Sequence, residues 1–92
     1  MIKSFRHKGL KVFFESGSTK GINSQHVNKI KRQLAVLNRA VKPEDVNMPG
    51  WNLHSLSGDL NDHYSIKVSG NWRMTFIFVG TDTELFDYQD YH

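Results

Sequence analysis

The stretch Tyr64–Val79, which reads YSIKVSGNWRMTFIFV, decides the fold of this 92-residue chain. Two runs within it alternate apolar with polar residues, and the apolar positions are Tyr64, Ile66, Val68, Trp72, Met74, Phe76 and Phe78. A period of two is typical of half-buried β-strands, and Gly70-Asn71 between the runs is typical of a hairpin turn. The stretch therefore predicts two antiparallel strands that share an apolar face. Ile77 and Val79 make the other face of the second strand partly apolar, so we expect that strand to be central.

The residues on either side of this hairpin extend the sheet. Gly80–Thr83 has the composition of a turn, and Glu84–Tyr91 alternates again, so we expect a last strand beside residues 72–79. On the N-terminal side, residues 51–62 lead into the hairpin through a turn-rich segment. The second half of the chain is therefore predicted to be an antiparallel meander of three or four strands.

Helical spacing replaces alternation in the first half. Apolar residues at positions 27, 30, 34, 37 and 41 recur at intervals of three and four, which predicts a long amphipathic helix at about 24–41. Pro43 ends this helix because the residue before a proline avoids the α region, and residues 43–46 can form one further turn.

A shorter helix is predicted near the start of the chain. Leu10, Phe13 and Phe14 have helical spacing over roughly 7–16, and Gly17 is a suitable residue to close the helix. Ile2 and Phe5 bracket a short apolar segment that we interpret as a first strand. The order of short strand, two helices and antiparallel meander predicts an α+β domain with the helices packed on one face of the sheet.

Composition limits the class of protein. Ninety-two residues suit a single domain spanning 1–92. The chain has no cysteine, no apolar run long enough to cross a bilayer and no pattern of a signal peptide, so we expect a cytoplasmic protein that is not in a membrane.

The charge of the chain is divided unevenly about Pro43. Residues 1–42 carry ten basic residues and one acidic residue, a net charge of +9, whereas residues 43–92 carry two basic and eight acidic residues, a net charge of −6. The basic half predicts a surface that binds a polyanion. Alternatively, the two halves neutralise each other across a small fold.

The absence of familiar motifs excludes several kinds of chemistry. No phosphate-binding GxxxxGK[ST], no GxGxxG and no HExxH is present, and without cysteine the five scattered histidines give weak support for a metal site. We therefore expect no metal and no cofactor.

A few polar residues remain as candidates for catalysis. The chain ends in Asp90, Tyr91 and His92, where two explanations stay open: positioned catalytic groups, or Tyr88 and Tyr91 packed on the helices with a free terminal histidine. His54 is either catalytic or a structural histidine. Arg73, the single cation of an otherwise uncharged strand, either faces the open side of the sheet or pairs with Asp87 or Asp90.

Two imidazoles, a guanidinium, a carboxylate and a phenol suit RNA cleavage through the ribose 2′-hydroxyl. The substrate supplies its own nucleophile, so the protein needs a base for the 2′ proton, an acid for the 5′ oxygen and a cation for the phosphate. DNA lacks this hydroxyl and is not expected to be cut.

Five segments that together span the chain resemble the HigB toxins of the RelE/ParE superfamily: MIKSFRHKGL (1–10), LHSLSGD (53–59), YSIKV (64–68), NWRMTF (71–76) and DYH (90–92). The resemblance implies a RelE-like fold of the microbial ribonuclease type. It also implies the toxin of a type II toxin–antitoxin system, a ribosome-dependent endonuclease that enters the 70S A site, cuts translated mRNA and inhibits translation.

The same resemblance implies partners and site residues. A helix-turn-helix antitoxin of HigA type would neutralise the toxin, and operator DNA would be reached only through that antitoxin. The residues that match the family's active site are His54, Arg73, Asp90, Tyr91 and His92. The histidines are assigned to proton transfer, Arg73 to phosphate charge, and Tyr91 and Asp90 to positioning.

Two further points concern RNA binding. Some relatives have a lysine where this chain has Ser57, so a cation near His54 is missing here. The basic residues of the long helix are then expected to bind ribosomal RNA phosphates without reading sequence; these are Lys29, Lys31, Arg32 and Arg39. The alternative is a solvated helix face.

Two other functions compete with the ribonuclease. A gyrase-inhibiting toxin of ParE type would bind its target without cleaving nucleic acid, and it would not need the acid and base groups at His54 and His92. A non-enzymatic RNA-binding module would depend on the basic helix alone, so His92→Ala would leave its activity intact.

Overall fold

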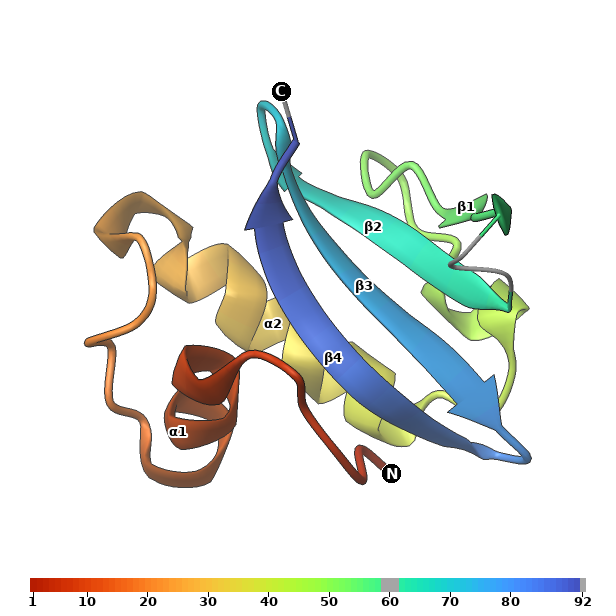
Figure 1. Cartoon of the computed structure of the whole chain (residues 1–92), viewed down its shortest axis with the longest axis horizontal. Helices are drawn as coiled ribbons and strands as arrows, with labels where there is room; N and C mark the ends of the chain where they lie inside the picture. Colours follow the sequence, from red (N-terminus) through yellow and green to blue (C-terminus); the bar gives the residue numbers. More distant parts are fainter. Residues whose placement is uncertain (59–61, 92) are drawn as a thin grey trace.

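The computed structural model describes residues 1–58 and 62–91 and shows two layers, an antiparallel sheet and a pair of helices packed on one face of it (Figure 1). The strands are β1 (His54–Ser55), β2 (His63–Ser69), β3 (Trp72–Val79) and β4 (Asp82–Asp90). They lie in the order β1-β2-β3-β4, so β3 is central between β2 and β4, as predicted. The α+β class and the meander are confirmed.

The helices are α1 (Lys8–Ser16) and α2 (Val27–Arg39). α1 begins where the Leu10 backbone N–H donates to His7 Nδ1 at 3.0 Å, and it ends at Gly17, which has φ +81° and donates to the Phe13 carbonyl. A left-handed residue at this position favours glycine. The short helix is therefore confirmed within a residue of its predicted limits.

The long helix is shorter than the predicted 24–41. Its first turn is the 3₁₀ helix η1 (Ser24–His26), and its last α-helical residue is Arg39, because Ala40 is already extended with ψ 140°. Pro43 begins a separate 3₁₀ turn, η2 (Pro43–Val46), as expected of a residue with fixed φ and no N–H. The extended residue before that proline carries the chain away from the helix axis.

The predicted first strand at residues 2–5 is wrong as a regular strand. Ile2 and Phe5 form two isolated parallel bridges, to Thr83 and Phe86 of β4. The Lys3 N–H donates to the Thr83 carbonyl at 2.8 Å, and the Arg6 N–H donates to the Phe86 carbonyl at 2.7 Å. The segment runs along β4 and covers an edge that would otherwise expose unpaired backbone groups (Figure 1).

The core lies between the sheet and the helices. Its fully buried apolar residues come from both layers and are Leu10, Ile30, Leu37, Val46, Ile66, Val68, Met74, Phe76 and Phe86. The Phe76 and Phe86 rings stack with their centroids 5.2 Å apart, so neighbouring strands also meet through their side chains. The residues predicted to form the apolar strand face all belong to this core or pack against it.

Two irregularities set which face each strand presents. The pairing of β2 with β3 shifts between Lys67 and Ser69, and the pairing of β3 with β4 shifts between Thr75 and Ile77. In both cases one strand carries an extra residue, a β-bulge. The bulge in β4 includes Leu85, which has the left-handed φ of +61°. Each bulge moves the following residues to the opposite face of the sheet.

Candidate active site

The face of the sheet turned away from the helices is polar. Residues directly opposite each other in an antiparallel ladder share a face. Two rows of partners therefore cross this face. The first row is His54, Ser65, Thr75 and Asp87, and the second is Lys67, Arg73 and Gln89. We call these seven residues the polar face.

Two central residues of the polar face are buried and one at its edge is exposed. Ser65 and Thr75 are only 4% and 5% exposed although no helix covers them. His54, at the edge in β1, is exposed. A polar sheet face with an accessible imidazole at its edge suits an extended polar ligand better than a small molecule.

Arg73 is held at the hairpin end of this face. Its Nη1 donates to the Gly70 carbonyl at 2.8 Å and to the Trp72 carbonyl at 3.2 Å. Asp87 instead accepts from the Tyr88 N–H at 2.9 Å and from the Gln89 amide at 2.7 Å. Arg73 thus bonds to backbone carbonyls and not to Asp87, the first of the two carboxylates that the sequence offered as its partner.

His54 and Arg73 lie on the same face but two strands apart. From strand spacing and residue rise, their Cα atoms are separated by about 12 Å. Ser65 and Thr75 lie between these two positions, and the Arg73 guanidinium is directed to the hairpin carbonyls of Gly70 and Trp72. This part of the predicted site is brought to one surface.

Lys67 is a candidate site residue that sequence reasoning missed. It pairs directly with Arg73, so two cations stand side by side at one end of the polar face. Its place among the polar positions of the 64–68 strand was the one sequence feature that could have indicated this role. A two-residue turn without a bulge, however, would have paired Lys67 with Met74 and directed it to the core. The bulge near Val68 brings it to the open side.

The C-terminal residues lie at the same end of the sheet as the hairpin that carries Arg73 (Figure 1). Asp90 pairs with Trp72 and is thus one residue out of phase with Arg73. Tyr91, 37% exposed, donates its N–H to the Asn71 carbonyl at 2.8 Å, and as the second residue after Gln89 it returns to the side of Arg73. His92 lies outside the described residues, so its predicted role stays a prediction.

A polar pair lies in the core beneath this end of the sheet. His26 is 5% exposed and Tyr88 is 4% exposed, and His26 Nδ1 lies 2.6 Å from Tyr88 Oη. Burial, and to a lesser extent the charge of Lys29, lowers the pKa of His26 below its usual value. Burial raises the pKa of Tyr88, partly offset by a backbone hydrogen bond from Asn23. The pair is therefore a neutral imidazole and a protonated phenol at neutral pH.

The predicted RNA-binding residues of α2 lie in the helical layer, behind the polar face. Lys31, Arg32 and Arg39 are exposed, whereas Lys29 is half-buried beside His26. The basic helix surface is confirmed as exposed at three of these positions. It is separated from His54 and Arg73 by the thickness of the sheet and helix layers.

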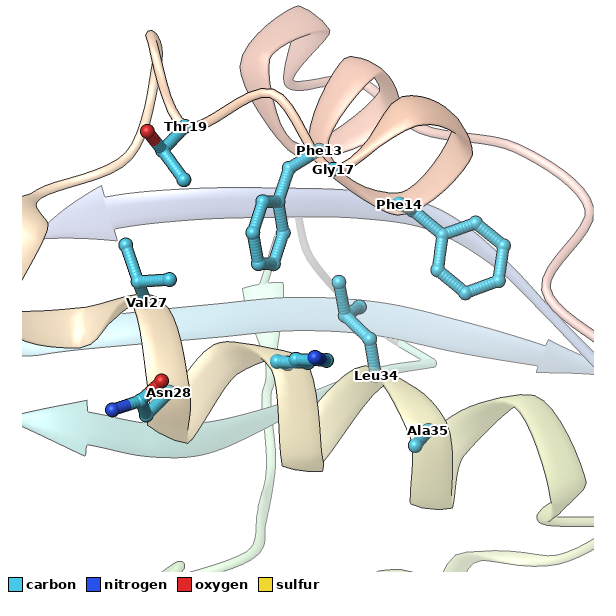
Figure 2. A pocket seen from close by; sticks show the side chains of 9 residues that line it. Phe13, Phe14, Gly17, Thr19, Val27, Asn28, Leu34 and Ala35 are labelled. Carbon is cyan, nitrogen blue, oxygen red and sulfur yellow. The ribbon is translucent and has the colours of Figure 1, made fainter.

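A groove of about 420 Å³ lies between α1 and α2, on the helical side of the molecule (Figure 2). Phe13 and Phe14 from α1 and Val27 and Leu34 from α2 line it (Figure 2), and so does Lys31. Its lining is mostly apolar, and it includes none of the four predicted catalytic residues that the structure describes, His54, Arg73, Asp90 and Tyr91.

Among residues 1–58 and 62–91, no three His, Asp or Glu side chains are grouped so that they could hold a metal ion. None of the helices in these ranges combines the length and hydropathy needed to cross a membrane.

The polar face has the groups for phosphodiester chemistry. Two cations can neutralise a phosphate, and an exposed imidazole nearby can transfer a proton.

Comparison with known proteins agrees with this chemistry. Residues 3–92 match the family model of HigB-like toxins, described as the RelE-like toxin of the type II toxin–antitoxin system HigB. The chain is also 44% identical to Endoribonuclease HigB of Proteus vulgaris over 92 residues, the full length of both proteins. The chain therefore belongs to the HigB-like family of RelE-like toxins, each of which forms a type II system together with an antitoxin.

Proposed function

We propose that this toxin is a ribosome-dependent endoribonuclease that cleaves translated mRNA in the A site and thereby inhibits translation. The observation that carries the proposal is the placement of His54, Lys67 and Arg73 on one open polar surface of the sheet. The 44% identity to a relative named as an endoribonuclease supports the same reaction class.

The chemistry follows from the substrate's own nucleophile. The ribose 2′ oxygen attacks the adjacent phosphorus, the bond from phosphorus to the 5′ oxygen breaks, and a 2′,3′-cyclic phosphate and a 5′-hydroxyl result. A base takes the 2′ proton and an acid supplies the proton of the leaving 5′ oxygen. We assign these two roles to His54 and His92.

The remaining residues stabilise charge and position the substrate. Arg73, with Lys67 beside it, stabilises the negative charge that grows on the phosphoryl oxygens in the transition state. Tyr91 and Asp90 position the substrate and neighbouring side chains. We infer no metal or cofactor for the reaction, because a general acid, a general base and fixed cations are sufficient for it.

The partners follow from the same proposal. Lys29, Lys31, Arg32 and Arg39 bind ribosomal RNA phosphates when the toxin docks on the 70S ribosome. A HigA-type helix-turn-helix antitoxin neutralises the toxin, and operator DNA is contacted only through it. Since translating ribosomes are the target, the toxin acts in the cytoplasm.

The test compares mRNA 5′ ends after induction of the wild type, His54→Ala, Arg73→Ala and His92→Ala. Cuts confined to translated regions are expected for the wild type. Each alanine variant should cleave about 10² to 10⁴ times more slowly, since a proton-transfer group or a transition-state cation is lost. Ser55→Ala is the matched control, because Ser55 is exposed in the same strand but pairs with Tyr64, out of phase with His54.

Other outcomes would assign a different function. Intact transcripts together with broken chromosomal DNA would indicate a gyrase-directed toxin. Intact transcripts and toxicity that survives His92→Ala would indicate an RNA-binding module. Cuts in untranslated RNA would contradict ribosome dependence but keep the ribonuclease.

A further inference from the structure

Three rings from three parts of the chain form a closed cluster beneath the hairpin end of the sheet. His26 comes from η1, Trp72 is the first residue of β3, and Tyr88 lies near the end of β4. Their ring centroids are 5.4 Å apart for His26 and Trp72, 4.7 Å for Trp72 and Tyr88, and 6.0 Å for His26 and Tyr88. We call these residues the ring triad.

The ring triad is next to two candidate catalytic segments. Trp72 immediately precedes Arg73 on β3, and Tyr88 precedes Asp90 and Tyr91 on β4. Trp72 and Asp90 are also direct partners in the ladder. The position of the ring triad therefore affects the distance from Arg73 to Asp90 and Tyr91.

A polar pair is an unusual choice for this part of the core. Farther along the same face, neighbouring strands meet through apolar rings, such as Phe76 and Phe86. A buried imidazole and phenol each lose hydration, which is offset only when they hydrogen-bond in a good geometry. The 2.6 Å contact between His26 Nδ1 and Tyr88 Oη meets that condition. This hydrogen bond allows a single arrangement of the two side chains, whereas apolar rings could pack in more than one.

We propose that His26 and Tyr88 are positioning residues: their hydrogen bond fixes the end of β4, and with it Asp90 and Tyr91, relative to Arg73 on β3. This inference rests on the proposed ribonuclease function, since it concerns the rate of that reaction. Neither residue touches the substrate, because both are buried on the helix side of the sheet.

The test removes the hydrogen bond and keeps the rings. Tyr88→Phe deletes only the hydroxyl, and Tyr64→Phe is the matched control, because Tyr64 packs on Phe76 and Phe78 on the same face of the sheet, away from the end of β4. mRNA cleavage is measured in a single turnover on programmed ribosomes at a series of ribosome concentrations. Tyr88→Phe is expected to lower the saturating rate about tenfold and leave the half-saturating ribosome concentration unchanged, since only alignment is lost. Tyr64→Phe should match the wild type.

A second variant tests the bond from its other side. His26→Leu should cause the same loss of rate as Tyr88→Phe, and the double variant should be no slower than either single one. Amide hydrogen exchange at Tyr91, whose N–H bonds to Asn71, should quicken in each of these variants. This measurement keeps the proposal testable even if one variant is too unstable for the kinetic assay.

The results distinguish this inference from the function on which it rests. If the wild type fails to cleave mRNA on ribosomes, the proposed function is wrong. If the wild type cleaves and Tyr88→Phe has the same saturating rate, the positioning role is wrong and the ribonuclease stands. Additive losses in the double variant, or a change only in the half-saturating concentration, would also overturn the positioning role.

Discussion

His26 should make the stability of this toxin depend on pH. Its pKa is lowered in the folded protein by burial, with a smaller contribution from Lys29. In the unfolded chain the imidazole has its usual pKa near 6.5. As the pH falls through that value, the unfolded state binds a proton that the folded state resists, so the free energy of unfolding falls.

The expected result is a lower midpoint of thermal unfolding at pH 5.5 than at pH 7.5. The part of this slope due to His26 cannot exceed about 1.4 kcal/mol per pH unit, the limit for one proton. His26→Asn removes the titration and retains a polar side chain, so its slope should be smaller. Equal slopes for the variant and the wild type, measured by circular dichroism, would rule out His26 as the source.

The buried state of His26 could not be predicted from the sequence. Position 26 falls four residues before Ile30, which is buried, but a histidine beside Asn23 and Ser24 has the appearance of a cap residue on the surface. Its burial depends on Trp72 and Tyr88, more than 40 positions away, and such a contact leaves no local pattern. His54 and Arg73 were predictable as candidates because they interrupt apolar or turn-rich segments.

At the scale of elements, the alternation of apolar and polar residues predicted where the strands lie but not which face each side chain occupies after a bulge. β3 has the limits that its apolar positions indicated, and the spacing of three and four residues located α2. A two-residue turn at Gly80-Thr81 with no bulge would have placed Phe86 opposite Thr75, on the polar face. The extra residue near Leu85 instead places Asp87 opposite Thr75 and returns Phe86 to the core. Bulges have no sequence signature that a single chain reveals.

Leu85 gives a test of this bulge. Its φ of +61° is unfavourable for any residue with a side chain, and more so for a β-branched one. Leu85→Ile keeps the apolar volume and should lower the free energy of unfolding by about 1 to 2 kcal/mol. For a domain of this size each kcal/mol corresponds to roughly 4 to 8 °C in the unfolding midpoint.

Leu53→Ile is the matched control for the bulge. Leu53 is also half-buried, but it has no positive φ, so its replacement should change the midpoint much less. If the two isoleucine variants lose the same stability, the backbone of Leu85 is not the cause. Chemical denaturation of both variants provides the measurement.

At the scale of the molecule, binding and chemistry are placed on different layers. Arg32 and Arg39 are exposed on α2, whereas His54 and Arg73 lie on the far face of the sheet. Changes in the helix should therefore alter affinity for the ribosome and leave the chemical step intact. This separation was not visible in the sequence, where the same charges indicated only a basic half.

Charge reversal tests the separation. Arg32→Glu with Arg39→Glu should raise the half-saturating ribosome concentration at least about tenfold at 0.15 M salt, because two phosphate contacts become repulsive. The saturating cleavage rate should stay the same. Lys8→Glu with Lys11→Glu makes the same change of charge on α1 and should have a smaller effect. A similar effect of both pairs would indicate net charge rather than a docking surface.

The two bulges also bear on how a chain of this kind can vary in length over evolution. In each bulged strand, one extra residue determines which side chains beyond the bulge face the core. The loss or gain of a single codon there would therefore move core side chains to the polar face, and polar ones to the core, along the rest of the strand. Insertions and deletions should consequently accumulate in segments outside the ladder, such as the loop between Gly17 and Asn23. The stretches near Val68 and Leu85 are expected to tolerate substitutions while keeping their residue count.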